Sequence, residues 1–338
     1  MSAVEPPNPG HSAPGAERPT APRFSVVIPL YNKRAHIGRA VASVLGQGVR
    51  DLELVVVDDG STDGGGDVVA AIDDPRLRLL RQPNQGVSAA RNRGIAETTG
   101  PHIALLDADD EWAPGFLGEI DALVGEFPQA IIHATAYRLA AGGHSRPMSN
   151  WKAMGGGPEH RLIDYLDCLA RDVFPFSASS VCVGRVAFER AGGFEPGLAV
   201  GDDVLMWIRL AQQGMVAWSN AELSFYHRDA ENRALEHPLR LERELDFLVH
   251  LVAHCRGDWH DSAAVPALRR FVSSKIAGTA ARLLRGDDPA RARQFLDCNR
   301  DLLLYRHALR LQARLLRHGI ARRLASRTRA DTDRGGRR

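Results

Sequence analysis

Four short apolar segments dominate the first 110 residues, and three of them are flanked at their ends by clusters of polar or acidic residues. Segments of this length, rich in valine, isoleucine and leucine, are typical of strands that are covered on both faces. Amphipathic or small-residue stretches of about a dozen residues, typical of helices, separate them. This alternation predicts an α/β fold with a mainly parallel sheet and right-handed crossovers. The predicted strands are residues 24–28, 54–57, 77–80 and 103–106.

The polar clusters follow the predicted strands at residues 29–33, 58–63 and 107–110. Open sheets of this type bind their ligands at the carboxyl ends of the strands. The three clusters are therefore expected to meet at one edge of the sheet and to form the ligand site.

Asp107, Asp109 and Asp110 follow the fourth strand within four residues. Several carboxylate oxygens in a small volume suit Mg²⁺ or Mn²⁺ that is shared with the phosphates of a ligand. The alternative is that these are ordinary turn and cap residues.

Two further segments suit an anionic or nucleoside ligand. In residues 58–63, Asp58 and Asp59 can accept hydrogen bonds, and Gly60 lets the chain turn close to a ligand. In residues 84–94, a helix start offers free N–H groups and Arg91 offers a fixed charge. The structural alternatives are a tight turn in which Ser61 or Thr62 caps the next helix, and a capped surface helix.

The motifs resemble the nucleotide-sugar domain of glycosyltransferase family 2, an inverting family with the GT-A fold. The resemblance covers roughly residues 24–227, and several motifs in family order are far more specific than one. The matching segments are 26–33, 56–63, 84–92, 105–110, 179–180, 192–194 and 201–209.

The resemblance implies roles for individual residues. Asp59 would accept the uracil N–H, Tyr31 would border the base, and Asp58 and Arg91 would help to hold the nucleoside. Asp109 would bind a divalent cation, Mn²⁺ or Mg²⁺, most directly. The implied nucleotide-binding set is Pro29, Tyr31, Asn32, Asp58, Asp59, Arg91 and Asp107, and the implied metal ligands are Asp107, Asp109 and His227.

Asp203 matches the family's catalytic aspartate, and Asp202 precedes it where glutamate is more usual. As a general base Asp203 would take the proton from an acceptor hydroxyl while that oxygen attacks the anomeric carbon opposite the diphosphate. Two carboxylates before a helix are also a common N-terminal cap.

The resemblance thus implies a metal-dependent inverting glycosyltransferase that moves a sugar from a nucleotide diphosphate sugar, a UDP-sugar, to a glycan or lipid-linked acceptor in polysaccharide or cell-envelope synthesis. A nucleotide-sugar-binding module without transfer activity is the alternative. A phosphatase that uses Asp107 fits less well, because Glu111 occupies the position where such enzymes need threonine. Sugar-phosphate nucleotidylyltransferases begin with a glycine-rich loop, and residues 29–32 are not one.

We divide the chain into a proline-rich disordered leader (residues 1–22), a GT-A domain (23–235), a helical region with a basic amphipathic end (236–328) and a disordered tail (329–338). No apolar run approaches the length of a membrane span, and the four scattered cysteines suit a reducing compartment. We therefore expect a cytoplasmic protein.

The net charge of +2 hides an uneven distribution, because residues 300–338 contain 12 arginines against three aspartates. The near-neutral total gives no reason to expect a nucleic-acid partner. A basic amphipathic helix can lie on an anionic membrane surface, which suggests peripheral contact with the cytoplasmic face of the membrane. The alternative is a helix packed on the catalytic domain with a solvated arginine face.

Overall fold

The computed structural model describes residues 21–148, 159–231, 240–257, 265–285 and 288–303. Most of the predicted leader, the basic segment from residue 304 onward and the predicted tail lie outside the described residues. Within the described part, no helix combines the length and apolar character that crossing a membrane requires.

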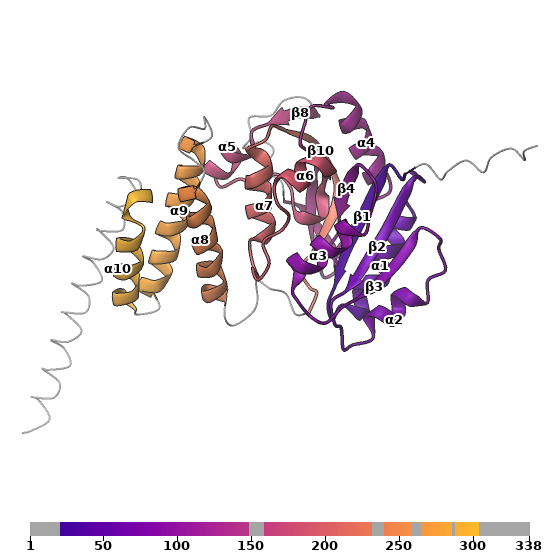
Figure 1. The fold of residues 1–338 in the computed structure, drawn as a ribbon, viewed down its shortest axis with the longest axis horizontal. Helices are drawn as coiled ribbons and strands as arrows, with labels where there is room; N and C mark the ends of the chain where they lie inside the picture. Colours follow the sequence, from indigo (N-terminus) through magenta and orange to yellow (C-terminus); the bar gives the residue numbers. More distant parts are fainter. Residues whose placement is uncertain (1–20, 149–158, 232–239, 258–264, 286–287, 304–338) are drawn as a thin grey trace, which may run out of the picture.

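The N-terminal part of the sheet has the predicted alternation of strands and helices (Figure 1). Its four strands are parallel and lie in the order β3-β2-β1-β4, with a helix between each consecutive pair in the sequence. The elements are β1 (Phe24–Leu30), α1 (Arg34–Leu45), β2 (Leu52–Asp58), α2 (Gly65–Ala70), β3 (Leu77–Arg81), α3 (Val87–Ala96) and β4 (His102–Leu105).

Beyond β4 the sheet is mixed, because β9 runs antiparallel to both β4 and β6. Within the described residues the sheet has ten strands, with the central order β3-β2-β1-β4-β9-β6-β10-β5, while β7 pairs with β6 and β8 with β10. The further elements are β5 (Glu111–Trp112), α4 (Phe116–Glu126), β6 (Ile132–Ala141), β7 (His144–Pro147), β8 (His160–Ile163), α5 (Tyr165–Ala170), η2 (Ala178–Ser180), β9 (Val181–Gly184), α6 (Arg185–Arg190), α7 (Asp202–Ala211) and β10 (Val216–His227).

Two predictions from the sequence need correction. The sequence predicts separate strands at residues 215–218 and 223–226, whereas β10 is one strand whose register shifts between Ser219 and Ser224. The helix predicted to be capped by Ser61 or Thr62 begins instead at Gly65. Ser61 is used elsewhere, because its hydroxyl accepts a hydrogen bond from the Asn32 backbone N–H at 3.1 Å.

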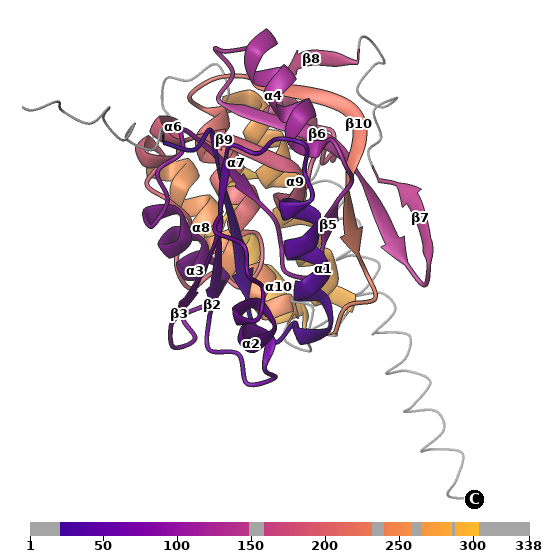
Figure 2. The ribbon, with the colours of Figure 1, turned by 90° about the vertical axis from the view of Figure 1, so that its right-hand side faces the viewer.

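Alternate residues of β1 supply the two hydrophobic cores on opposite faces of the sheet. Val26 and Ile28 belong to the core beneath α1 and α4. Val27 belongs to the other core, which includes Ile95 of α3 and Trp207 of α7. Figure 2 shows α1 and α3 on opposite sides of the N-terminal strands.

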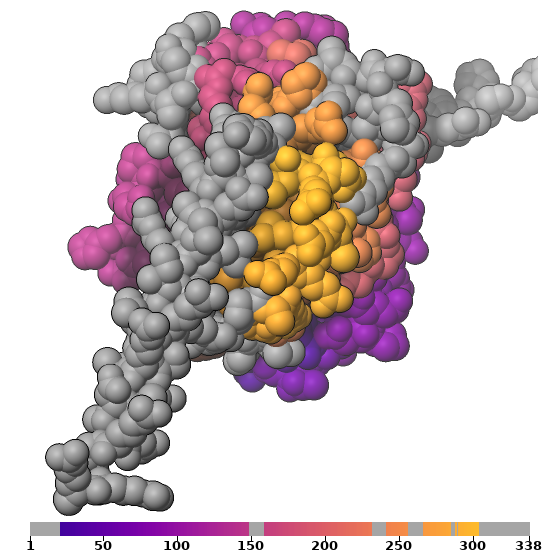
Figure 3. All heavy atoms as spheres, turned by 90° about the vertical axis from the view of Figure 1, so that its left-hand side faces the viewer, coloured from indigo at the N-terminus to yellow at the C-terminus, as the bar shows by residue number. Residues whose placement is uncertain are grey.

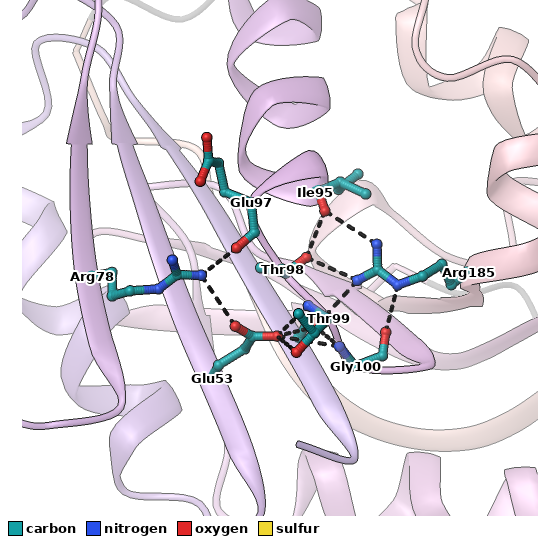
Figure 4. A network of polar contacts seen from close by, with 9 residues as sticks. Glu53, Arg78, Ile95, Glu97, Thr98, Thr99, Gly100 and Arg185 are labelled. Carbon is teal, nitrogen blue, oxygen red and sulfur yellow. Dashed lines mark hydrogen bonds and ion pairs between the residues drawn. The ribbon is translucent and has the colours of Figure 1, made fainter. Parts of the chain in front are cut away.

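A polar network ties the amino ends of the strands together (Figure 4). The Glu53 carboxylate on β2 accepts hydrogen bonds from the Ser25 hydroxyl at 2.8 Å and from the Thr99 and Gly100 backbone N–H groups at 2.6 and 3.2 Å. Arg185 donates to the Gly100 carbonyl at 2.8 Å from the other side of the same turn. The network fixes the turn between α3 and β4 at the edge opposite the carboxyl ends.

The C-terminal region forms helices that pack against the sheet domain. α9 contacts α5 of that domain as well as α8 and α10, and α10 lies on the outer surface in yellow in Figure 3. The described residues of this region are mainly helical. The helices are α8 (Arg240–Gly257), α9 (Val265–Arg285) and α10 (Pro289–Cys298).

Candidate active site

The three polar clusters predicted from the sequence lie at the carboxyl ends of β1, β2 and β4. β1 is the common neighbour, because it pairs in parallel with both β2 and β4. The first turn of α7 adds Asp202 and Asp203 to this edge through contacts with α3. The predicted convergence of the polar clusters is therefore present in the structure.

Arg91 joins the strand side of the site to the helix side. Its Nη2 lies 2.6 Å from Asp107 Oδ1, and its Nη1 lies 2.6 Å from Asp202 Oδ2. The Phe194 ring lies beneath the guanidinium, with 5.3 Å between the guanidinium carbon and the ring centroid. Arg91 is only 3% exposed. Burial alone would lower the pKa of Arg91, but the adjacent carboxylates outweigh it and raise that pKa, so the side chain stays charged.

Asp203 lies next to this ion-paired group. Its Oδ1 accepts a hydrogen bond from the Val204 backbone N–H at 2.7 Å. Among the described residues nothing donates a hydrogen bond to Oδ2. Burial, followed by repulsion from Asp202, raises the pKa of Asp203 to about 6, although Arg91 opposes the shift. A carboxylate whose pKa is raised, and whose second oxygen accepts no hydrogen bond from the described residues, is suited to accept a proton near neutral pH.

The two aspartates after β2 face different surroundings. Asp59 Oδ1 accepts hydrogen bonds from Gln82 Nε2 at 2.7 Å and from the Gln85 backbone at 2.9 Å, and Oδ2 accepts one from the Gly86 backbone at 2.8 Å. Two carboxylate oxygens can accept about four such bonds, so one acceptor position of Asp59 is left. Asp58 lines a hollow of about 370 Å³ with Gly60, Ser61, Arg81, Gln82 and Pro83.

The loop after β1 is joined to the loop after β2. Asn32, in the left-handed region at φ 50°, accepts a hydrogen bond from the Thr62 backbone at 2.8 Å. Tyr31 next to it is 47% exposed, which leaves its ring available for a ligand. Pro29 lies inside β1, opposite Val57 of β2. Of the predicted nucleotide-binding residues, Tyr31 is thus the most accessible and Pro29 supports the loop from within the sheet.

Asp109 lies at the same edge, but its carboxylate has a basic partner. Lys33 Nζ lies 2.8 Å from Asp109 Oδ2 and also donates to the Glu231 carbonyl. Among the described residues, no three His, Cys, Asp or Glu side chains are placed to hold a metal ion together. Magnesium sites often combine one or two carboxylates with substrate phosphates. Asp107 and Asp109 are two carboxylates that could form a site of that kind, and each is paired with a basic side chain in this structure.

His227 is close to the site, but its ring faces other groups. The ring Nε2 lies 3.0 Å from Glu111 Oε1, and Nδ1 lies 3.7 Å from Asp229 Oδ1. The His227 backbone N–H donates to Asp110 Oδ1 at 2.9 Å. The structure therefore links His227 to the segment 107–110 through its backbone, and does not bring its ring together with Asp107 and Asp109.

Sequence reasoning assigned no role to Lys33 and Ser179, and it counted Asp110 only among the carboxylates suited to a metal ion. The Ser179 hydroxyl donates to Asp110 Oδ2 and accepts from the Asp107 backbone N–H. Asp110 is fully buried, and burial together with its acidic neighbours raises its pKa well above the ordinary value. Lys33 and Ser179 lie inside the recognised motifs, but the motifs do not show what their side chains contact.

Solved structures of glycosyltransferases share this arrangement of sheet and helices. TarS of S. aureus, residues 1–349 in complex with UDP-GlcNAc, superposes with a TM-score of 0.59 at 17% identity over 84% of this chain and 93% of that one. A mannosyltransferase of Pyrobaculum calidifontis in complex with GDP-Man and Mn²⁺ gives 0.58 at 21% identity, over 89% and 87%. The chain thus has the GT-A fold, the class that the sheet and its polar edge define.

A comparison of the sequence with known protein families matches part of the chain. Residues 25–177 match the model of glycosyl transferase family 2. Over this domain, which is a little under half of its length, the chain is similar to glycosyltransferase family 2.

Two curated relatives each align with less than a third of the chain. The glycosyltransferase alr2836 of Nostoc is 43% identical over 101 residues, which are 29% of this chain and 31% of that protein. The Escherichia coli glycosyltransferase YibD is 43% identical over 94 residues, 27% of each chain. The matched part therefore covers less than a third of the length of either relative.

Proposed function

We propose that the chain is a glycosyltransferase that moves a sugar from a nucleotide diphosphate sugar, a UDP-sugar, to a hydroxyl of a glycan or lipid-linked acceptor with inversion at the anomeric carbon. The observation that carries this proposal is the pair of 2.6 Å contacts through which Arg91 holds the strand carboxylate Asp107 beside the segment that contains Asp203. A donor-binding edge and a candidate base are thereby parts of one cluster.

The donor would lie along the carboxyl ends of β1, β2 and β4. The hollow beside Asp58 and the exposed ring of Tyr31 offer a place for the base. The remaining acceptor position of Asp59 would receive a base N–H. Asp107 and Asp109 would hold a divalent cation, which when bound would neutralise charge on the leaving nucleoside diphosphate. Support for a cation comes from the family neighbour that was solved with Mn²⁺.

The chemical step would use Asp203. The acceptor oxygen forms a bond to the anomeric carbon while the bond from that carbon to the diphosphate oxygen breaks, and Asp203 Oδ2 takes the hydroxyl proton. General-base catalysis of this kind contributes about 10²–10⁴ in rate. Arg91 fixes the neighbouring Asp202, and the adjacent carboxylate helps to keep Asp203 basic enough for the task.

The experiment that tests this proposal is a donor screen on the wild-type protein. A panel of UDP- and GDP-sugars with Mn²⁺ would be examined by thermal shift, and the stabilising donors would then be tested for release of the nucleoside diphosphate. We expect at least one UDP-sugar to stabilise the protein and to be consumed. Stabilisation without any release would support the alternative, a nucleotide-sugar-binding module.

The location of the protein is a separate proposal. We infer a cytoplasmic protein with peripheral membrane contact through the basic segment, and this rests on the charge of residues 300–338.

A further inference from the structure

The C-terminal helical region reaches the backbone directly before the proposed base. Gly201 precedes Asp202 and Asp203 and is the N-cap residue of α7, with φ +80°. A Cβ atom at this position would lie 2.6, 2.7 and 2.9 Å from three ring carbons of Phe247. The Phe247 ring therefore lies directly against the Gly201 backbone, and both the positive φ and this contact require glycine.

Phe247 is firmly placed by its own helix. α8 presents Phe247, Leu248, Leu251 and Val252 to the core, at 9, 3, 0 and 7% exposure. These residues lie on one face of the helix and share a hydrophobic cluster with Trp207 of α7. Figure 1 shows α8 next to α7. The ring against Gly201 is thus the end of a continuous packed interface.

The neighbouring helix α9 fastens this interface to the sheet domain. Lys275 of α9 lies 3.2 Å from Asp172 Oδ1, and its Nζ lies 5.2 Å from the centroid of the Phe174 ring. Both partners belong to the segment that follows α5. The α8–α9 pair therefore packs against the sheet domain at two places, the start of α7 and the segment after α5.

The first turn of α7 has two independent restraints. From α3, Arg91 and the Ser88 hydroxyl donate to Asp202 Oδ2 at 2.6 and 3.3 Å. From α8, Phe247 limits where Gly201 can lie. Asp203 follows within two residues, so a shift of Gly201 moves the backbone that carries the Asp203 carboxylate.

We propose that Phe247 is a positioning residue for Asp203, so that the C-terminal helices complete the active site of the sheet domain. The proposal rests on the proposed function. A misplacement of about 1 Å at a reacting group can cost on the order of 10²-fold in rate. Phe247→Ala is therefore expected to lower kcat for donor turnover by about 10- to 100-fold. Donor affinity should stay within about twofold, because Phe247 contacts Gly201, which is not among the residues proposed to bind the donor.

The test compares Phe247→Ala and Phe247→Leu with Leu251→Ala. Leu251 is one helical turn further along α8, fully buried in the same cluster, and absent from the atoms nearest to Gly201. For each full-length variant, kcat would be measured as nucleoside diphosphate release, donor affinity by calorimetry and folding by circular dichroism. We expect loss of kcat in Phe247→Ala, partial rescue in Phe247→Leu, and a kcat within threefold of wild type in Leu251→Ala. If Phe247→Ala does not fold, Phe247→Leu tests the proposal alone. Its kcat should then lie below that of wild type but above the level left by the loss of about 10- to 100-fold expected for Phe247→Ala.

Wild-type kcat in both Phe247 variants would overturn the proposal. An equal loss of kcat and donor affinity in Phe247→Ala and Leu251→Ala would also overturn it, because general packing would then explain the effect. A wild-type protein that consumes no donor would instead contradict the proposed function, and this inference with it.

Discussion

Arg91 shows how a single side chain connects segments that are far apart in the sequence. It contacts Asp107, 16 residues away, and Asp202, 111 residues away. The motif around Arg91 predicts a charge at a helix start, and the resemblance implies a nucleoside contact. Its guanidinium contacts two protein carboxylates, so in the structure it links the strand side of the site to α7.

The ion pair between Lys33 and Asp109 leads to a prediction for a single side chain. The Lys33 ammonium group pairs with the Asp109 carboxylate at 2.8 Å, with the two side chains 12 and 18% exposed. At the proposed cation site, Mn²⁺ would have to compete with Lys33 for Asp109. Lys33→Met is therefore expected to tighten Mn²⁺ binding in the absence of donor by about two- to fivefold, in keeping with the modest strength of such ion pairs.

Mn²⁺ titration followed by electron paramagnetic resonance would measure this change. Arg34→Met is the matched control, since Arg34 is adjacent in the sequence and contacts Asp63 instead of Asp109. Unchanged or weaker Mn²⁺ binding in Lys33→Met would show that Lys33 does not compete for the site.

At the scale of elements, the amino edge of the sheet provides stability, whereas the carboxyl edge provides the site. Glu53 is the centre of the amino-edge network in Figure 4. Its removal would leave the Thr99 backbone N–H and hydroxyl without this acceptor, and Arg78 would lose its ion pair with the carboxylate. Glu53→Ala is expected to lower the free energy of unfolding by about 2 kcal/mol, because hydrogen bonds to charged groups are the stronger ones.

Urea unfolding would check this value. Glu97→Ala serves as the control, because the Glu97 side chain is exposed and only its carbonyl contacts Arg78 in the network. Donor binding should be the same in both variants, since the network is at the edge opposite the site. An unfolding free energy of Glu53→Ala that matches the control would mean that solvent replaces these contacts without cost.

Elements that depend on local patterns were predictable, and elements that depend on long-range contacts were less so. The apolar runs predicted β1, β2 and β4, because burial on both faces of a strand leaves a clear sequence signal. The start of α2 was missed, since Ser61 bonds to Asn32 across the sheet edge instead of capping a helix. The continuity of β10 was missed because its register shifts interrupt the apolar alternation.

For the candidate site, the sequence predicted the residues better than their contacts. The site residues could be found from their positions after the strands and from the family resemblance. Their partners could not, because the Lys33–Asp109 pair and the Phe247–Gly201 contact join residues that no local pattern relates.

At the scale of the whole molecule, the structure joins two parts that the sequence separates. Family 2 resemblance stops near residue 227, and the sequence leaves the following helices without a role. In the structure α8 and α9 pack against the sheet domain, and α8 reaches the start of α7. The sheet domain and the described C-terminal helices therefore form one packed unit, with Asp203 next to their interface.

The rate of nucleoside diphosphate release as a function of pH, in wild type and Asp203→Asn, tests the central claim most directly. A base must be deprotonated to act, and the pKa of Asp203 is raised to about 6. The wild-type rate should therefore fall about tenfold per pH unit below about pH 6. Asp203→Asn should bind donor normally and lose at least about 10²-fold in rate at neutral pH. Full turnover by Asp203→Asn, with the same decline at low pH, would contradict the assignment of Asp203 as the base.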